Sequence, residues 1–280
     1  MSAPKDTRFL RELAAPGAPD LRADRVALVV AHPDDETIGV GGQLSRLRSI
    51  TVIHATDGSP RAHSEHRAYA RQRRRELEAA MALAGVSKDA LVALGFIDQE
   101  VSLHLAELTR RLAGLFDERR VAIVMTHPYE GGHPDHDAVS FAVHAAREIM
   151  ARKPIDAPDV IEMAFYHGGP AGMVAQRFVP ADVPTIELPL SDAAWALKRR
   201  MLAAHASQVD ALTQFDSRVE RFRVAPSYDF GALPNGGSLY YETADWGMTG
   251  ARWQELAAAA CRELGVECAT PPPADSPRER

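Results

Sequence analysis

Two short segments of the chain combine histidine and aspartate at spacings that suit a metal site. The first is His32-Pro33-Asp34-Asp35-Glu36, and the second is His133-Pro134-Asp135-His136. Imidazole nitrogens and carboxylate oxygens are usual zinc ligands, and a catalytic zinc site takes three of them together with a water. If the two segments lie together in the folded chain, they predict a catalytic metal site.

The spacing within the segments indicates which residues would bind the metal. His32 and Asp35 stand three positions apart, so one helical turn would direct both side chains the same way. His136 from the second segment would complete the set of metal ligands. Asp34 is then free to take a proton from the attacking water, because a metal lowers the pKa of such a water to about 7.

Hydrolysis of an amide needs two further contributions, which the second segment can supply. The oxyanion of the tetrahedral intermediate must be stabilised, and the departing amine needs a proton. His133 can serve either purpose, and Asp135 would then fix the tautomer of His133. A single His-Pro-x-Asp segment is more often a turn with a capping aspartate than a metal site. Two such segments, each after a predicted strand, favour the metal.

The elements that must position these segments alternate along the chain. Apolar, β-branched runs predict buried strands at 26–31, 50–55, 91–96, 121–126, 160–166 and 185–190. Helical periodicity predicts helices at 67–83, 103–116, 193–209 and 249–264, and a short helix that carries Leu44 and Leu47. The alternation predicts an α/β, Rossmann-like fold, a mostly parallel sheet with helices on both faces. Ligands of such sheets bind at the carboxyl ends of the strands, where both segments lie.

Bulk properties limit the classes of protein that remain possible. The 280 residues carry a formal net charge of −6, which argues against a nucleic-acid partner. The basic run at 71–75 is interpreted as a solvated helix face. No stretch reaches the ~20 apolar residues of a membrane span, and 1–24 lacks the apolar run of a signal peptide. We therefore expect a cytoplasmic protein, while its oligomeric state is left open.

We expect a single domain over 1–269, because no Gly/Ser-rich or Pro-rich linker divides it. Residues 270–280 are rich in proline and predict a disordered tail. The two cysteines, Cys261 and Cys268, predict neither a disulfide framework nor a metal-binding pair.

The paired segments also resemble a known family. Ala31 to Glu36 together with His133 to His136 look like the motifs of the PIG-L/LmbE zinc-dependent de-N-acetylases, in the same order and with a fitting separation. Thr56-Asp57-Gly58 resembles the family loop after the second strand, and Arg73-x-x-Glu76 resembles its arginine-rich helix. The resemblance extends over nearly the whole chain and weakens after the second motif.

The resemblance implies a substrate and a cofactor. The substrate would be a small N-acetylated sugar or glycoconjugate of the N-acetylglucosamine type, and the cofactor Zn²⁺ or another divalent metal. Asp98 would bind sugar hydroxyls, and Arg73 would contact the substrate. The stretch 127–132, before the second motif, departs from the longer Gly/Tyr-containing stretch of the family. The resemblance therefore leaves the aglycone and the acyl group undefined.

Two other functions stay open at this point. One is a zinc amidase that acts on another N-acyl substrate, such as a thiol conjugate or a natural product. The other is a non-catalytic sugar- or nucleotide-binding module. Against the module, Gly39-Val40-Gly41-Gly42-Gln43-Leu44 lacks the last glycine of a dinucleotide-binding fingerprint.

Several further residues are weighed against a structural role. His54 is interpreted as a core residue, and the structural interpretation is also favoured for His127 and His167. Asp57 is equally compatible with a turn and with a site. The aromatic segment 228–246 either packs on the core or forms a wall of the pocket, and the sequence favours neither.

Overall fold

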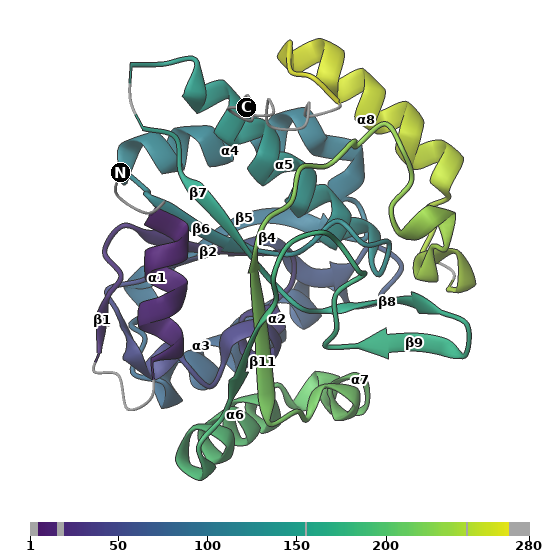
Figure 1. The fold of residues 1–280 in the computed structure, drawn as a ribbon. Helices are drawn as coiled ribbons and strands as arrows, with labels where there is room; N and C mark the ends of the chain where they lie inside the picture. The colour runs from purple at the N-terminus through teal and green to yellow at the C-terminus, as the bar shows by residue number, and fades with distance from the viewer. Residues whose placement is uncertain (1–4, 16–19, 155, 245, 269–280) are drawn as a thin grey trace.

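The computed structural model describes residues 5–15, 20–154, 156–244 and 246–268 (Figure 1). Its central sheet has seven strands in the order β10-β11-β7-β6-β2-β4-β5. In chain order these are β2 (Val26–Val30), β4 (Thr51–Pro60), β5 (Leu91–Asp98), β6 (Ile123–Thr126), β7 (Asp159–Met163), β10 (Ile186–Pro189) and β11 (Val219–Val224). The first five are parallel, and β10 and β11 are antiparallel additions at one edge. The predicted mostly parallel sheet is confirmed.

Smaller elements surround this sheet. Two short pairs, β1 (Leu21–Arg22) with β3 (Leu47–Arg48) and β8 (Tyr166–Gly169) with β9 (Gly172–Ala175), lie outside it. The helices are α1 (Lys5–Ala14), α2 (Asp35–Val40), α3 (His66–Leu83), α4 (Leu105–Glu118), α5 (Pro134–Ala151), α6 (Asp192–Ala204), α7 (Val209–Leu212) and α8 (Gly250–Leu264). Within the described ranges, no helix has both the length and the apolar character needed to cross a membrane.

Helices cover both faces of the sheet, as expected (Figure 1). The alternation of side chains along β2 shows how. Ala27 and Val29 pack in a core with α4, α5 and α8, whereas Leu28 and Val30 pack in a second core with α1, α3 and α6. Because β2 is buried on both faces, its sequence is continuously apolar.

The order of the strands places the two histidine-rich segments side by side. β2 pairs with β4 on one side and with β6 on the other, so the chain winds outward in both directions from β2. The loops after β2 and β6 therefore flank the crevice at which α/β sheets bind ligands.

Some elements differ from the expectation. The short helix expected around Leu44 begins earlier, at Asp35, and a 3-10 turn covers Leu44–Arg46. Strand β11 lies in a region where no strand was expected, because the charged residues Glu220, Arg221 and Arg223 interrupt the apolar run. Cys261 and Cys268 are joined by a disulfide, which the sequence did not indicate. The helix α8 ends between them, and the Val266 N–H donates back to the Cys261 carbonyl. The expected tail at 270–280 lies outside the described residues.

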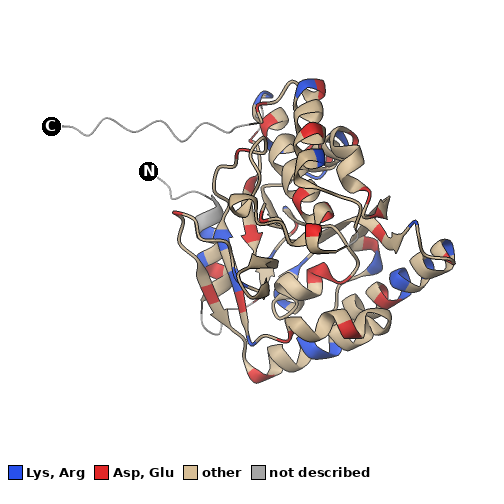
Figure 2. Ribbon diagram, turned by 90° about the vertical axis from the view of Figure 1, so that its right-hand side faces the viewer, with Lys and Arg blue, Asp and Glu red and all other residues tan. Residues whose placement is uncertain are grey.

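Charged residues are dispersed over the fold. Figure 2 shows Lys and Arg interspersed with Asp and Glu. The basic run at 71–75 lies on α3 with most of its side chains toward solvent, as expected, but Arg73 is buried. That exception brings Arg73 to the site described next.

Candidate metal centre

The first histidine-rich segment forms the turn between β2 and α2. The Asp35 carboxylate folds back on this turn, and its Oδ2 atom accepts a hydrogen bond from the His32 backbone N–H at 2.7 Å. The same oxygen lies 3.2 Å from His32 Nδ1, while Oδ1 lies 3.3 Å from His136 Nε2. Although burial raises the pKa of Asp35, the surrounding imidazoles lower it well below its usual value. Asp35 is therefore an ionised carboxylate between the two histidines.

The second segment forms the start of α5. His133 is the N-cap residue of this helix and Pro134 occupies its first turn, a common arrangement at helix starts. His136 then projects from the first turn toward the first segment. The ring centroids of His32 and His136 are 5.2 Å apart, and those of His32 and His133 are 4.6 Å apart. The topology thus brings together two segments that are a hundred residues apart.

The described residues contain three sets of potential ligand atoms within 4.8 Å of one another, and all lie at this position: His32, His133 and His136; Asp35, His127 and His136; His32, Asp98 and Asp135. Buried imidazole and carboxylate donors fit a divalent transition metal such as zinc. The predicted ligands His32, Asp35 and His136 are distributed over these overlapping sets. Their assignment as the metal ligands remains a prediction.

His127 is less suited to bind a metal, although it belongs to one of the sets. Its Nε2 atom accepts a hydrogen bond from the Ala31 N–H at 2.9 Å, so the lone pair of this nitrogen is already used. Burial and the neighbouring His136 lower the pKa of His127 to about 3, which keeps the ring neutral. The ring stacks on His136 with centroids 4.0 Å apart. These contacts support the structural interpretation of His127.

Asp34 lies beside the cluster in an unusual backbone conformation. Its φ of 141° is in a region that residues other than glycine rarely adopt. The Asp34 N–H donates to Glu36 Oε2 at 3.1 Å, and Asp34 Oδ2 accepts a hydrogen bond from Arg73 at 3.0 Å. Burial raises the pKa of Asp34 to about 6, although Arg73 acts in the opposite direction. A carboxylate with this pKa beside a metal site suits a general base near neutral pH.

Arg73 connects the loops on either side of Asp34. Besides Asp34, its guanidinium donates to the Pro33 carbonyl at 2.6 Å and to the Gly58 carbonyl at 3.0 Å. Gly58 has a φ of +67°, and a Cβ atom there would lie 2.8 Å from Pro33 Cδ and 3.0 Å from the Arg73 guanidinium carbon. Glycine is therefore required for this close approach. These contacts describe a positioning residue, and the contact between Arg73 and substrate stays a prediction.

The Asp135 carboxylate is bonded to backbone N–H groups and makes no hydrogen bond to His133. The Asp135 oxygens instead accept hydrogen bonds from the Gln99 N–H at 2.6 Å and the Val101 N–H at 3.1 Å. Asp135 is drawn there because these N–H groups would otherwise be buried without a partner. One of its oxygens also lies 3.3 Å from His32 Nε2.

Asp135 nevertheless fixes the tautomer of His133 through its backbone. The Asp135 N–H donates to His133 Nδ1 at 3.1 Å, so Nδ1 is an acceptor. Burial, followed by the neighbouring histidines, lowers the pKa of His133 well below its usual value. A neutral imidazole whose Nδ1 atom accepts carries its proton on Nε2. His133 is therefore a hydrogen-bond donor through Nε2.

Asp57, in the last part of β4, and Asp98, at the end of β5, lie near the same position. Asp98 ends β5, and its Oδ1 atom lies 3.0 Å from His32 Nε2. Its role in binding sugar hydroxyls stays a prediction. Asp57 accepts a hydrogen bond from the Ser59 N–H at 3.0 Å, the geometry of a turn-forming aspartate.

Sequence reasoning did not find a buried network behind the first segment. The Glu36 carboxylate lies 3.0 Å from His54 Nε2 and 3.6 Å from His205 Nε2, and all three side chains are buried. The interpretation of His54 as a core residue is confirmed. His205 had no visible partner in the sequence because its partner lies 169 positions away.

A cavity of about 270 Å³ opens beside the cluster. Polar residues of the cluster line it together with Gln99 and Gln208. Apolar or aromatic residues from distant parts of the chain also line it: Tyr69, Tyr166, Leu212, Phe215 and Trp246. The Trp246 ring lies 4.5 Å from that of His133. The aromatic segment 228–246 therefore has both suggested roles, because Tyr241 is fully buried in the core while Trp246 lines the cavity.

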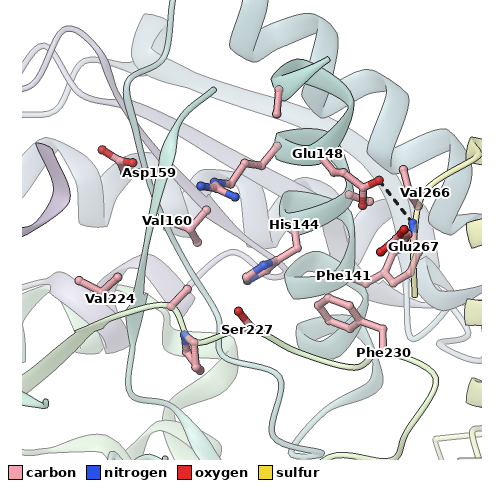
Figure 3. Close-up of a pocket in the computed structure, with 15 residues that line it drawn as sticks. Phe141, His144, Glu148, Asp159, Val160, Val224, Ser227, Phe230, Val266 and Glu267 are labelled. Carbon is pink, nitrogen blue, oxygen red and sulfur yellow. Dashed lines mark hydrogen bonds between the residues drawn. The ribbon is translucent and has the colours of Figure 1, made fainter. Parts of the chain in front are cut away.

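A second cavity, of about 260 Å³, lies away from the cluster (Figure 3). It is lined by the last turns of α5 and the amino end of β7. Its Glu148 accepts a hydrogen bond from the Glu267 N–H at 3.4 Å. Burial and the adjacent Arg147 lower the pKa of His144 to about 4. None of the three ligand sets lies here, and the amino end of a strand is not where such sheets bind their ligands.

Comparisons with known proteins agree with this site. The model of the family PIG-L, GlcNAc-PI de-N-acetylase, matches residues 27–147, which include both segments. A Bacillus subtilis (strain 168) protein, probable N-acetyl-alpha-D-glucosaminyl L-malate deacetylase 2, is 30% identical over 151 residues, or 50% of this chain and 67% of that protein.

Two solved structures share the fold. One is the deacetylase Dbv21 of the A40926 pseudoaglycone, with a TM-score of 0.54, 16% identity and coverage of 72% of this chain and 96% of that one. The other is the N,N'-diacetylchitobiose deacetylase from Pyrococcus horikoshii, with a TM-score of 0.52 and 18% identity. The match covers 95% of this chain and 91% of that one. By its sequence match and its fold, the chain belongs to the PIG-L family of de-N-acetylases.

Proposed function

We propose that this protein is a zinc-dependent hydrolase that removes the N-acetyl group from an N-acetylglucosamine-type sugar or conjugate. The observation that carries this proposal is the placement of Asp34 beside the cluster of His32, Asp35 and His136. Metal-assisted amide hydrolysis requires a carboxylate that does not bind the metal itself and lies next to the metal ligands. The family supports the reaction, since the Bacillus relative is named as a deacetylase of an N-acetylglucosaminyl conjugate.

His32, Asp35 and His136 would hold the zinc ion. When bound there, zinc polarises the amide carbonyl and makes a water more acidic. The two imidazoles and one carboxylate match the donors of known catalytic zinc sites. The Asp35 carboxylate orients His32 and His136, since each of its oxygens lies within 3.3 Å of one of them.

Asp34 would accept the proton of the attacking water as a general base. Three hydrogen bonds hold Asp34 in place. The Asp34 N–H donates to the Glu36 carboxylate, and the Arg73 guanidinium donates both to the Asp34 carboxylate and to the carbonyl of the preceding Pro33. Such anchoring keeps the carboxylate in a productive geometry without reorganisation during the reaction.

His133 would donate a hydrogen bond through Nε2–H to the developing oxyanion, and the proton that Asp34 takes from the water would pass to the departing amine. Asp135 supports this role by holding His133 Nδ1 as an acceptor through its N–H. The product amine would leave as a free amino sugar with acetate as the second product. Asp98, at the edge of the cavity, would bind sugar hydroxyls.

An amidase that acts on another N-acyl group is the second candidate function. The same residues would perform the same chemistry, and the cavity lining would select a different acyl group. A non-catalytic binding module is disfavoured, because such a module does not need a buried carboxylate held beside a ligand cluster.

We also propose that 1–269 is a single domain.

The test is release of free amine from N-acetylglucosamine and its glycosides, measured with the wild type and with Asp34→Asn. The proposal predicts amine release that depends on added zinc and on Asp34. Amine release that is equal in the two proteins would exclude this mechanism.

A further inference from the structure

The cavity beside the cluster is lined by more carboxylates than lysine or arginine side chains. Asp34, Asp35 and Asp98 all contribute carboxylates to its lining. Among the lining residues, all of them in the described part of the chain, Arg73 is the one lysine or arginine. A divalent metal at the cluster, together with Arg73, would balance these three carboxylates, so no lining cation would remain in excess for an anionic aglycone.

Arg73, which lines the cavity, and Arg61, which follows a lining residue, are both already paired with carboxylates. The Arg73 side chain is 4% exposed, and its guanidinium is bonded to Asp34 and two backbone carbonyls. Arg61 follows the lining residue Pro60, but its guanidinium forms a two-point ion pair with Glu100 at 2.6 and 2.7 Å. An anionic group in the cavity would therefore lose its hydration without gaining a counterion.

The outer walls of the cavity offer apolar and aromatic surface instead. Leu212 and Phe215 form one wall. The Tyr166 ring lies 5.7 Å from that of Phe215 and 5.4 Å from that of His136, so Tyr166 connects this wall with the cluster. Trp246 continues this surface to the cluster. Aromatic surfaces of this kind pack against the apolar faces of sugar or aryl rings.

We infer that this protein selects conjugates in which the group joined to the N-acetylglucosamine unit is uncharged and presents a flat apolar face. This inference rests on the proposed function, because it places the N-acetyl group at the cluster and the aglycone against the outer walls. It sets this chain apart from an enzyme that acts on a malate conjugate, whose aglycone carries carboxylates.

A pair of synthetic substrates of equal size tests the inference. The 4-carbamoylphenyl and 4-carboxyphenyl glycosides of N-acetylglucosamine differ by one negative charge, and both anomers of each are assayed. The neutral glycoside is expected to have a kcat/KM about tenfold higher than that of the anionic one, the size of a modest uncompensated charge effect. An anionic glycoside that reacts as fast as the neutral one, or faster, would overturn the inference.

An introduced charge at the rim provides a matched test. Ala211 lines the cavity and is exposed, so a longer side chain is tolerated there. Ala211→Lys is expected to lower the neutral-to-anionic ratio of kcat/KM several-fold relative to Ala211→Met, which has a similar length and no charge. The same ratio in both variants would contradict the proposed position of the aglycone.

Binding separates this inference from the proposed function. Calorimetry with Asp34→Asn measures the affinity for each glycoside without turnover. Tighter binding of the neutral glycoside supports the inference even if the wild type releases no amine, in which case the proposed reaction alone fails. Binding of neither glycoside contradicts the inference.

Discussion

Arg73 Nη2 lies 3.0 Å from Asp34 Oδ2 and 2.6 Å from the Pro33 carbonyl, so one guanidinium group holds both the carboxylate and the turn that carries it. The two residues are 39 positions apart, and Arg73 belongs to a helix whose neighbouring arginines face solvent. The strained φ of Asp34 persists because these contacts over-determine it. Arg73 is in this account a positioning residue.

Arg73→Lys should lower kcat about 10- to 100-fold with little change in KM, because an ammonium group cannot reproduce the planar fork that contacts three oxygens. Metal content should remain that of the wild type. Arg74→Lys is the matched control, since Arg74 lies on the same helix and pairs with Glu78 toward solvent. Equal kinetics for the two variants would show that Arg73 does not position Asp34.

Asp34→Asn should lower kcat about 10²- to 10⁴-fold, the usual contribution of a general base, while zinc stays bound. Steady-state kinetics and metal analysis of the same preparation measure both quantities. Asp57→Asn serves as a control, because Asp57 contacts the turn at Ser59 instead of the cluster. Loss of zinc from Asp34→Asn would instead make Asp34 a ligand.

His136→Ala should lose the metal. The expected result is less than stoichiometric zinc after dialysis and loss of the thermal stabilisation that zinc gives the wild type. His144→Ala is the control, because His144 lies two turns further along α5 and outside every ligand set. A His136→Ala protein with full zinc content would contradict the ligand assignment.

A buried ion pair contacts α2, the helix that begins at Asp35. Lys198 Nζ lies 2.9 Å from Glu220 Oε1 and donates to the Ile38 carbonyl at 2.8 Å, and both charged side chains are fully buried. Lys198→Met should lower the free energy of unfolding by about 3–5 kcal/mol, because it leaves the buried Glu220 carboxylate without its counterion. Lys153→Met removes an exposed pair with Asp117 and should cost less than about 1 kcal/mol. Chemical denaturation of both variants measures the difference, and equal costs would contradict this account.

The disulfide at the end of α8 joins Cys261 and Cys268, which are seven positions apart in the sequence. In the chain-entropy account, a loop of this size stabilises the fold by about 2 kcal/mol. Cys268→Ser should show that loss in denaturation, and mass spectrometry after alkylation should find no free thiol in the wild type. If protein purified from a reducing cytoplasm instead has two free thiols, the disulfide between Cys261 and Cys268 does not form there. That result would contradict the disulfide as a stable part of the fold and would agree with the predicted cytoplasmic location.

The sequence predicted the sheet and the position of the cluster, because both depend on local signals. His32 and Asp35 follow β2, His136 lies at the start of the helix after β6, and parallel strands bring their carboxyl ends to one edge. Two strand–loop segments were therefore enough to locate the site.

The contacts that orient the site could not be predicted in the same way. The Asp135 carboxylate turns toward the Gln99 and Val101 N–H groups, which are brought to it only by the folded chain. The bond between Arg73 and Asp34 depends on the packing of α3 against β4, and Trp246 reaches the cavity from more than a hundred residues after the second segment. Each depends on tertiary packing, which no spacing along the sequence encodes.

The central claim is tested most directly by a zinc titration of metal-free protein, with amine and acetate release from an N-acetylglucosamine glycoside measured at each step. The account predicts that both products appear in equal amounts and that their rate rises with bound zinc up to one ion per chain. Equal rates with and without zinc, or full zinc loading with release of neither product from any N-acetylglucosamine glycoside, would contradict it.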